Sequence, residues 1–134
     1  CMQNGSWFWV LGFLYMKRAY RLRRPEQFQR ARREGRSWSS SLVALNAVSN
    51  RRQGSRCGFI AGKRIGNAVQ RNRARRRLRE VVRLAYLHIV PGWDLVFVVR
   101  STAVATVAFP ELQATVEQLL RRAGLWREFH PAGG

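Results

Sequence analysis

One segment, residues 63–83, restricts the fold and the partners of this chain more than any other; it reads KRIGNAVQRNRARRRLREVVR. The segment contains nine Lys and Arg residues and a single acid, Glu80. Its small and apolar residues predict a long helix over about residues 68–89, because at 100° per residue they fall on one side. That apolar stripe consists of Ala74, Leu78, Val81, Val82, Ala85 and Ile89. We expect the stripe to face a sheet.

The opposite side of this helix is strongly basic. Its central stripe is formed by Asn72, Arg76, Arg79 and Arg83, with Arg73, Arg77 and Glu80 beside it. Like charges four residues apart destabilise a helix by about 0.2–0.5 kcal/mol per pair, and several arginine pairs here have that spacing. Only Glu80 can relieve the repulsion, by reaching Arg76, Arg77 or Arg83. A merely hydrated helix face normally mixes acids with bases, so this pattern favours a polyanionic partner.

The overall charge points in the same direction. The 134 residues include 25 Lys and Arg against 7 Asp and Glu, a formal net charge of +18. With 46% apolar residues, the chain can bury the core of one domain. Such a charge indicates nucleic acid first and an anionic membrane surface second, and it counts against a stand-alone acid–base enzyme. Structured RNA fits better than B-DNA, because no helix-turn-helix, zinc-finger or leucine-zipper pattern is present.

The sequence predicts no metal site and no catalytic residue of its own. No C-x-x-C or H-x-x-x-H spacing exists, and no clustered Asp/Glu pair is available for two-metal nuclease chemistry. Cys1 and Cys57 are expected to be free thiols in a reducing cytosol, with a disulfide between them as the alternative. His88 is expected to pack or to end a helix rather than to act as a general base, and His130 falls in the tail.

The two ends of the chain differ from its centre. Residues 1–15 carry no charge, and residues 7–16 are too short an apolar run to span a bilayer. We interpret residues 1–15 as a dispensable extension or a misassigned start before Met16. The alternative is a membrane-surface anchor with Trp7 and Trp9 at the interface. We expect residues 16–124 to form a single RNA-binding domain and residues 125–134 a flexible tail.

Local patterns predict the remaining elements of an α+β domain. A first helix should begin near Pro25 and end at Gly35, and a last helix should run from Pro110 to Gly124. Residues 42–48 and 56–61 are predicted to be two strands of a hairpin with a long connection. Residues 94–100 form a continuous apolar run, which is typical of a strand buried on both faces at the centre of a sheet. Residues 101–108 are predicted to be a linker of small residues.

The basic segment also carries a specific resemblance. GNAVQRNR at residues 66–73, followed by further basic residues up to Arg79-Glu80, resembles the RNR signature of the protein component of bacterial ribonuclease P. KRIG at residues 63–66 matches the upstream half of that motif. The residues around Arg21-Leu22, Phe28-Gln29 and Gly35 are similar to the first helix of the family. Residues 94–100 are similar to its central strand, and the similarity spans residues 16–124.

The resemblance implies a fold that composition alone does not suggest. It implies a small mixed four-stranded sheet packed with three helices and containing a left-handed βαβ crossover (a ribosomal protein S5 domain 2-like fold). Right-handed crossovers are overwhelmingly preferred in proteins, so the left-handed path follows only from the resemblance.

The resemblance further implies a function: a cytoplasmic protein subunit that binds a catalytic RNA and helps it to remove the 5′ leader of precursor tRNA. The RNA would carry the chemistry with Mg²⁺ that it mainly binds itself, and the protein alone would be inactive. Ribonuclease P RNA and precursor tRNA are the implied partners, with no stable membrane partner and no required protein partner. The implied contacts to the catalytic RNA are Lys63, Arg64, Asn67, Arg71, Asn72, Arg73, Arg75, Arg76, Arg79 and Arg83.

A cleft between the first helix and the sheet would receive the leader, with Phe28, Arg32 and Arg100 as its residues. The chain departs from the family pattern at two places: Ala61-Gly62 replace small polar residues before the basic loop, and Arg32 replaces a second aromatic. Phe28 is therefore the predicted stacking residue, with a core position as its alternative. The alternative function for the whole chain is a non-catalytic RNA-binding protein, such as a ribosomal or RNA-chaperone module.

Overall fold

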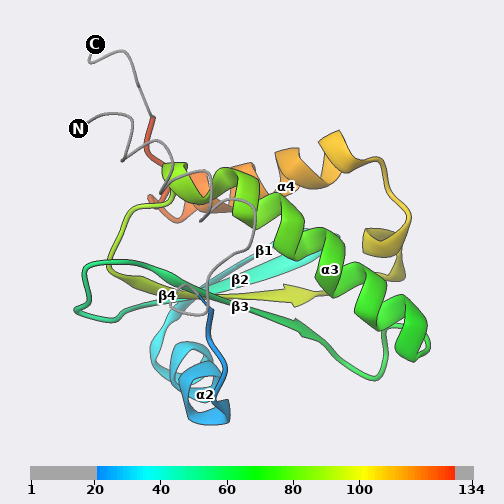
Figure 1. Cartoon of the computed structure of the whole chain (residues 1–134), viewed down its shortest axis with the longest axis horizontal. Helices are drawn as coiled ribbons and strands as arrows, with labels where there is room; N and C mark the ends of the chain where they lie inside the picture. Colours follow the sequence, from blue (N-terminus) through cyan, green and yellow to red (C-terminus); the bar gives the residue numbers. More distant parts are fainter. Residues whose placement is uncertain (1–20, 129–134) are drawn as a thin grey trace, which may run out of the picture.

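The computed structural model describes residues 21–128, so the interpretations of residues 1–15 and of the last residues of the chain lie outside the described part. Figure 1 shows a sheet with helices on both faces. The helices are α2 (Pro25–Glu34), α3 (Ala68–Ala85) and α4 (Phe109–Arg122), with short 3-10 helices η2 (Tyr86–His88) and η3 (Thr102–Ala105). The strands are β1 (Arg36–Ser39), β2 (Val43–Ser49), β3 (Arg56–Ala61) and β4 (Trp93–Val99).

The four strands follow the order β1-β2-β4-β3, which confirms that the apolar strand β4 is central. The predicted hairpin between the second and third strands is wrong, because β4 lies between them. β2 pairs with β4 antiparallel and β3 pairs with β4 in parallel, so both strands use β4 as their neighbour. The turn chemistry at residues 50–55 is real, but a turn signal does not say which strand will pair with the strand that follows it.

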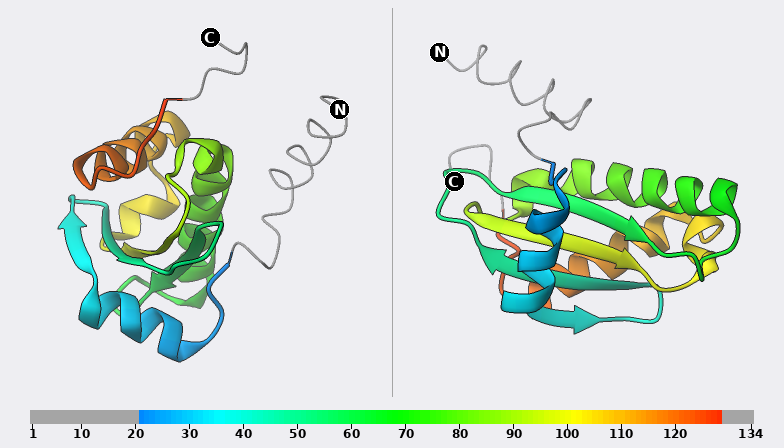
Figure 2. Two further views of the ribbon diagram at one scale, coloured as in Figure 1. Left: turned by 90° about the vertical axis from the view of Figure 1, so that its left-hand side faces the viewer. Right: turned by 90° about the horizontal axis from the view of Figure 1, so that it is seen from below.

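The parallel strands β3 and β4 are joined through α3, and this crossover is left-handed. In the right panel of Figure 2, α2 lies in front of the sheet, β3 and β4 run in the same direction, and α3 returns behind the sheet. The α+β class, the mixed sheet and the unusual hand implied by the resemblance are therefore confirmed. The consequence for function is that α2 and α3 lie on opposite faces of the sheet.

The two faces of the sheet bury two separate apolar clusters. On the α3 side, side chains of β4 such as Leu95 and Phe97 pack with α4 and with the predicted stripe of α3. Within that stripe, Ala74, Leu78, Val81 and Val82 are all buried. On the α2 side, Val96 packs with Leu22 and Ala31, which covers β4 on its second face. This double burial is why the strand has no polar alternation in the sequence.

A buried ion pair fixes the ends of the central strands. The Asp94 side chain is 2% exposed and accepts two hydrogen bonds from Arg56, at 2.9 and 2.7 Å, across the β3–β4 pairing. Asn50 donates a third bond to the same carboxylate at 2.9 Å and ties in the β2–β3 connection. The neighbouring Cys57 is a free, fully buried thiol, as expected, and its burial raises the pKa of the thiol above the usual range.

The folded part of the chain continues past Gly124, where the sequence places the start of a flexible tail. Leu125 is buried, its N–H donates to the carbonyl of Leu120, and its own carbonyl accepts from Val90. α3 ends at Ala85 rather than continuing to residue 89 as predicted, and Ile89 is extended and forms a β-bridge with Trp126. None of the helices formed by residues 21–128 is long and apolar enough to cross a membrane.

Candidate nucleic-acid interface

The loop before α3 is held in shape by its own polar residues. Gly66 has a φ of +60°, and a Cβ at this position would lie 1.8 Å from the side-chain oxygen of Gln70. Asn67 caps the helix by accepting from the Gln70 N–H at 2.9 Å, and Gln70 accepts from the Asn67 N–H in return. Arg71 donates to the Gly66 carbonyl at 2.8 Å. The structure therefore gives the predicted contacts Asn67 and Arg71 a role in shaping the loop.

The cationic ends of Lys63 and Arg64 are exposed on this loop, directly before the N-terminus of α3. The first helical turn has no acid, so the positive end of the helix dipole is not compensated within that turn. A positively charged loop next to an uncompensated helix N-terminus favours binding of an anion such as a phosphate group.

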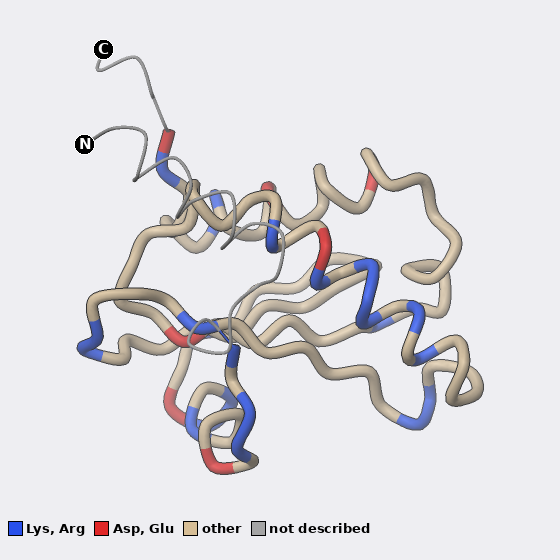
Figure 3. Tube along the Cα trace, in the orientation of Figure 1, with Lys and Arg blue, Asp and Glu red and all other residues tan. Residues whose placement is uncertain are grey.

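The outward face of α3 forms a shallow basic groove of about 600 Å³ lined by Val69, Asn72, Arg73, Arg76 and Arg77. Among these residues, Asn72, Arg73 and Arg76 are exposed, and Val69 is 74% exposed. Arg75 lies half-buried beside the groove and donates to the Asn72 side chain. Figure 3 shows that basic residues recur along α3 and its preceding loop with one acidic position between them. The predicted basic face is thus present on the side that faces away from the sheet.

Two arginines of α3 are engaged within the protein. Arg77 donates to the carbonyls of Val104, at 2.9 Å, and Val107, and so holds the segment around η3 against α3. Arg83 binds Glu80 with two hydrogen bonds, and its side chain is only 12% exposed. The hydrogen bond from Arg83 lowers the pKa of Glu80, which is the one acid of the helix. The predicted RNA contact Arg83 is therefore mainly an intrahelical partner.

Arg79 occupies a different position from the exposed arginines. Its guanidinium carbon lies 6.0 Å from the centre of the Phe59 ring, on the half-buried edge of β3. Burial and the nearby charges of Arg21, Arg75 and Arg76 lower the pKa of Arg79. Sequence reasoning missed Phe59 at this place, although it follows Cys57 on the same face of β3 and the alternation of the strand could have indicated it.

None of the seven acidic residues neutralises the exposed arginines of α3. All seven lie within residues 21–128. Five of them form ion pairs: Glu34 with Arg30 and Arg33, Glu80 with Arg83, Asp94 with Arg56, and Glu117 and Glu128 with Arg121. The other two, Glu26 and Glu111, lie in the first turns of α2 and α4. The basic face therefore has no internal counter-charge, and an external polyanion is the partner that it fits.

The three residues predicted for the leader lie on the other face of the sheet or at its end. Phe28 is half-buried on α2, and its ring packs so closely on Gly58 that a Cβ there would come within 2.4 Å. It adjoins a partly buried row on the sheet that includes Ile60 and Val98. Arg32 is exposed on α2, and Arg100 is exposed after β4, where it donates to the Ser40 carbonyl at 2.9 Å. Phe28 therefore packs on the sheet without being fully buried, and its stacking on a leader base stays a prediction.

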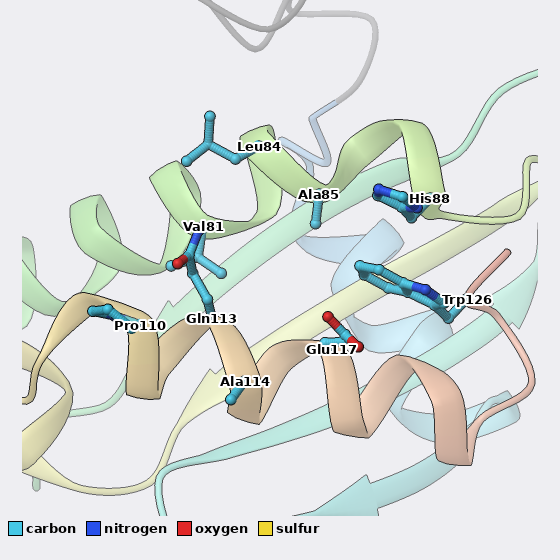
Figure 4. A pocket seen from close by; sticks show the side chains of 9 residues that line it. All are labelled: Val81, Leu84, Ala85, His88, Pro110, Gln113, Ala114, Glu117 and Trp126. Atoms are coloured by element: carbon cyan, nitrogen blue, oxygen red, sulfur yellow. The ribbon is translucent and has the colours of Figure 1, made fainter. Parts of the chain in front are cut away.

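A cavity of about 400 Å³ between α3 and α4 is not part of the basic face. Figure 4 shows its lining, which includes Val81, Leu84, Ala114 and the facing rings of His88 and Trp126. The two rings are stacked with their centres 4.3 Å apart, and the Nδ1 atom of His88 is 3.0 Å from the Arg127 carbonyl. This confirms the prediction that His88 is a packing residue at a helix end. No group of three or more His, Cys, Asp or Glu residues within 21–128 is placed to hold a metal ion.

Comparison with known proteins adds to this geometry. The family model described as Ribonuclease P matches residues 16–124. The ribonuclease P protein component of Roseiflexus sp. (strain RS-1) is 64% identical over 110 residues, which cover 82% of this chain and 90% of that protein.

Solved structures agree with the sequence match. The ribonuclease P protein of Thermotoga maritima has a TM-score of 0.70 at 28% identity, covering 76% of this chain and 96% of that one. A Staphylococcus aureus ribonuclease P protein mutant with defective mRNA degradation activity has a TM-score of 0.74 at 28% identity, covering 83% of this chain and 93% of that one. The family model covers residues 16–124, and the chain shares its backbone fold with solved members and contains the RNR helix. This chain therefore belongs to the bacterial ribonuclease P protein component family.

Proposed function

We propose that the basic face of α3 and the loop before it bind the catalytic RNA of ribonuclease P, and that the protein assists this RNA in removing the 5′ leader of precursor tRNA in the cytoplasm. The observation that carries the proposal is the basic face itself: Arg73 and Arg76 are exposed on a well-anchored helix, and no acid of the chain pairs with them. Such a face gains most from neutralisation by closely spaced phosphates.

The α2 side of the sheet supports a second contact, with the single-stranded leader. A partly exposed aromatic ring such as Phe28 offers a surface for base stacking, which is worth about 1–3 kcal/mol per base in single-strand binding proteins. Arg32 and Arg100 are exposed cations that can contact leader phosphates. Because α2 and α3 lie on opposite faces of the sheet, the protein can hold the catalytic RNA and the leader at the same time (Figure 2).

The hydrolysis is assigned to the RNA. Mg²⁺ would act there as the ion that stabilises the developing charge on oxygen, and it would be bound mainly by the RNA. The carboxylates of the chain are committed to arginines or to the first turns of helices, so this protein contributes binding and orientation rather than ligands or a general base.

Reconstitution tests the proposal. Adding the protein to a bacterial ribonuclease P RNA at low Mg²⁺ should increase cleavage of precursor tRNA. The increase should be larger for a substrate whose leader has several nucleotides than for one whose leader is a single nucleotide. Cleavage that the protein does not stimulate would contradict the proposal and favour a non-catalytic RNA-binding protein.

A second assay tests the assignment of the chemistry. Purified protein without the RNA should not process precursor tRNA in Mg²⁺. Because the related Staphylococcus aureus protein is associated with mRNA degradation, the assay includes an unstructured mRNA fragment as a second substrate. Cleavage that follows the protein through purification, and that persists when RNA contaminants are removed, would refute the assignment to RNA.

A further inference from the structure

Arg21 lies outside the RNR helix, yet the fold brings it to the same edge of the sheet as Arg79. Arg21 forms a parallel β-bridge with Cys57, and the Leu22 N–H donates to the Cys57 carbonyl at 2.9 Å. This places the chain at residues 21–22 along the free edge of β3. Arg79 extends from α3 over Phe59, two residues further along the same strand. The two cations are close enough for Arg21 to contribute to the lowered pKa of Arg79.

In both arginines the Nε–H group is a hydrogen-bond donor without an acceptor in the described part of the chain. The Nε atoms of Arg21 and Arg79 are shielded from solvent and have no hydrogen-bond partner among residues 21–128. A buried donor without an acceptor is unfavourable, and more so when it belongs to a charged group. Two neighbouring guanidinium groups repel each other, and each has an Nε–H donor without an acceptor among the described residues, so a shared anion would stabilise the arrangement.

The chain itself cannot supply that anion from a side chain. Each acid within 21–128 is either paired elsewhere or placed in the first turn of α2 or α4, as described above. The sequence contains no acid in residues 1–20 or 129–134. Arg75 and Arg76 add further positive charge near Arg79. No carboxylate side chain of the chain is therefore available to these two donors, which favours an anion supplied by a bound molecule.

We propose that Arg21 and Arg79 together form a binding site for one phosphate group of an RNA backbone, at the edge of β3 beside the ring of Phe59. The proposal rests on the RNA-binding function proposed above and adds to it a contact from outside the RNR helix. A phosphodiester has two non-bridging oxygens, and each can accept a hydrogen bond from one of the two guanidinium groups. The bound phosphate then supplies the missing acceptors and reduces the repulsion between the two charges. A planar guanidinium suits this geometry better than an ammonium.

The first test uses inorganic phosphate and the full chain. In a protein with ¹⁵N-labelled arginine, the Nε–Hε signals of Arg21 and Arg79 should shift together during a phosphate titration at constant ionic strength, with one common dissociation constant. Arg23, an exposed neighbour of Arg21, serves as the control and should not shift. The signals are assigned with the variants Arg21→Gln and Arg79→Gln. Separate dissociation constants, or equal shifts at Arg23, would refute a shared site.

The second test measures how binding to a bacterial ribonuclease P RNA depends on salt. Arg21→Gln and Arg79→Gln should each reduce the slope of log K against log salt by about 0.7–0.9, the value of one phosphate contact. The double variant should lose no more than either single variant, because both side chains bind the same phosphate. Arg23→Gln should leave the slope unchanged. Additive losses in the double variant, or an equal loss in Arg23→Gln, would overturn the proposal.

The two tests separate this inference from the proposed function. If the unaltered protein binds the RNA with a steep salt dependence but Arg21→Gln does not change it, the inference fails and the function stands. If the unaltered protein does not bind the RNA, the function fails. Arg21→Lys and Arg79→Lys keep the charge but lose the planar fork, so they provide folded variants if a Gln variant unfolds. They should retain the salt slope but lose at least threefold in affinity for phosphate, and an unchanged affinity would contradict a requirement for the planar guanidinium groups.

Discussion

Two substitutions on opposite faces of α3 should change different properties, one the stability and the other RNA binding, and their comparison tests the orientation of the helix. Leu78 is completely buried in the core between α3, α4 and the sheet, whereas Arg76 is exposed two positions earlier and lines the basic groove. Leu78→Ala should lower the free energy of unfolding by about 2–5 kcal/mol, the range for a buried Leu that leaves a cavity. At roughly 4 °C per kcal/mol for a domain of this size, the melting temperature should fall by roughly 8–20 °C.

Arg76→Ala should leave the free energy of unfolding within about 0.5 kcal/mol of the parent protein, because the side chain makes no core contact. Its binding to structured RNA should weaken regardless of sequence, and the salt slope should fall by about 0.7–0.9. Thermal melts and binding isotherms from low to moderate salt measure both quantities, with binding recorded well below the melting temperature of Leu78→Ala. If Arg76→Ala binds with an unchanged slope, or melts as early as Leu78→Ala, the assignment of the RNA-binding face is incorrect.

Three further substitutions test other parts of the structure. Gly66→Ala should weaken RNA binding and cost about 1–3 kcal/mol, because a φ of +60° and the contact with Gln70 do not accommodate a Cβ; a melt and an RNA-binding isotherm measure the two effects. Asp94→Ala should cost about 3–5 kcal/mol in a denaturant titration, since it leaves the Arg56 charge without its buried partner. Phe28→Leu should keep the packing on Gly58 but reduce affinity for precursor tRNA with a long leader, and equal losses for a leaderless tRNA would argue against stacking.

The strength of the local pattern decides which parts of the fold could be predicted from the sequence. The uninterrupted apolar run of β4 predicts a strand covered on both faces, and the structure covers it with α2 on one side and α3 and α4 on the other. The apolar stripe of α3 was equally clear. β1 has the sequence RSWS and an exposed edge position, so it carries no such pattern. The strand order and the crossover hand depend on packing between distant elements, which local spacing does not encode.

The roles of individual arginines were less predictable than the basic face that they form. Arg73 and Arg77 stand four residues apart on the same helix, yet Arg73 is exposed and Arg77 binds the carbonyls of Val104 and Val107. The difference arises because the segment around η3 packs against one side of α3, and its acceptors are distant in the sequence. The hydrogen bonds of a long, flexible side chain depend on which acceptors lie within its reach. The helical spacing predicts only the side of the helix from which the side chain projects.

The distribution of acids explains how a chain with a net charge of +18 can fold and still keep a binding surface. Three acids stabilise the fold itself. Asp94 forms the ion pair between β3 and β4, and Glu117 and Glu128 both bind Arg121, which anchors residues 125–128 to α4. Glu80 restrains Arg83 near the end of α3, beyond the groove lined by Arg73 and Arg76. These acids therefore stabilise parts of the protein outside the basic groove. The repulsion within the basic face remains uncompensated in the free protein, and phosphates can relieve it only when they arrive together at closely spaced positions, as they do along a folded RNA.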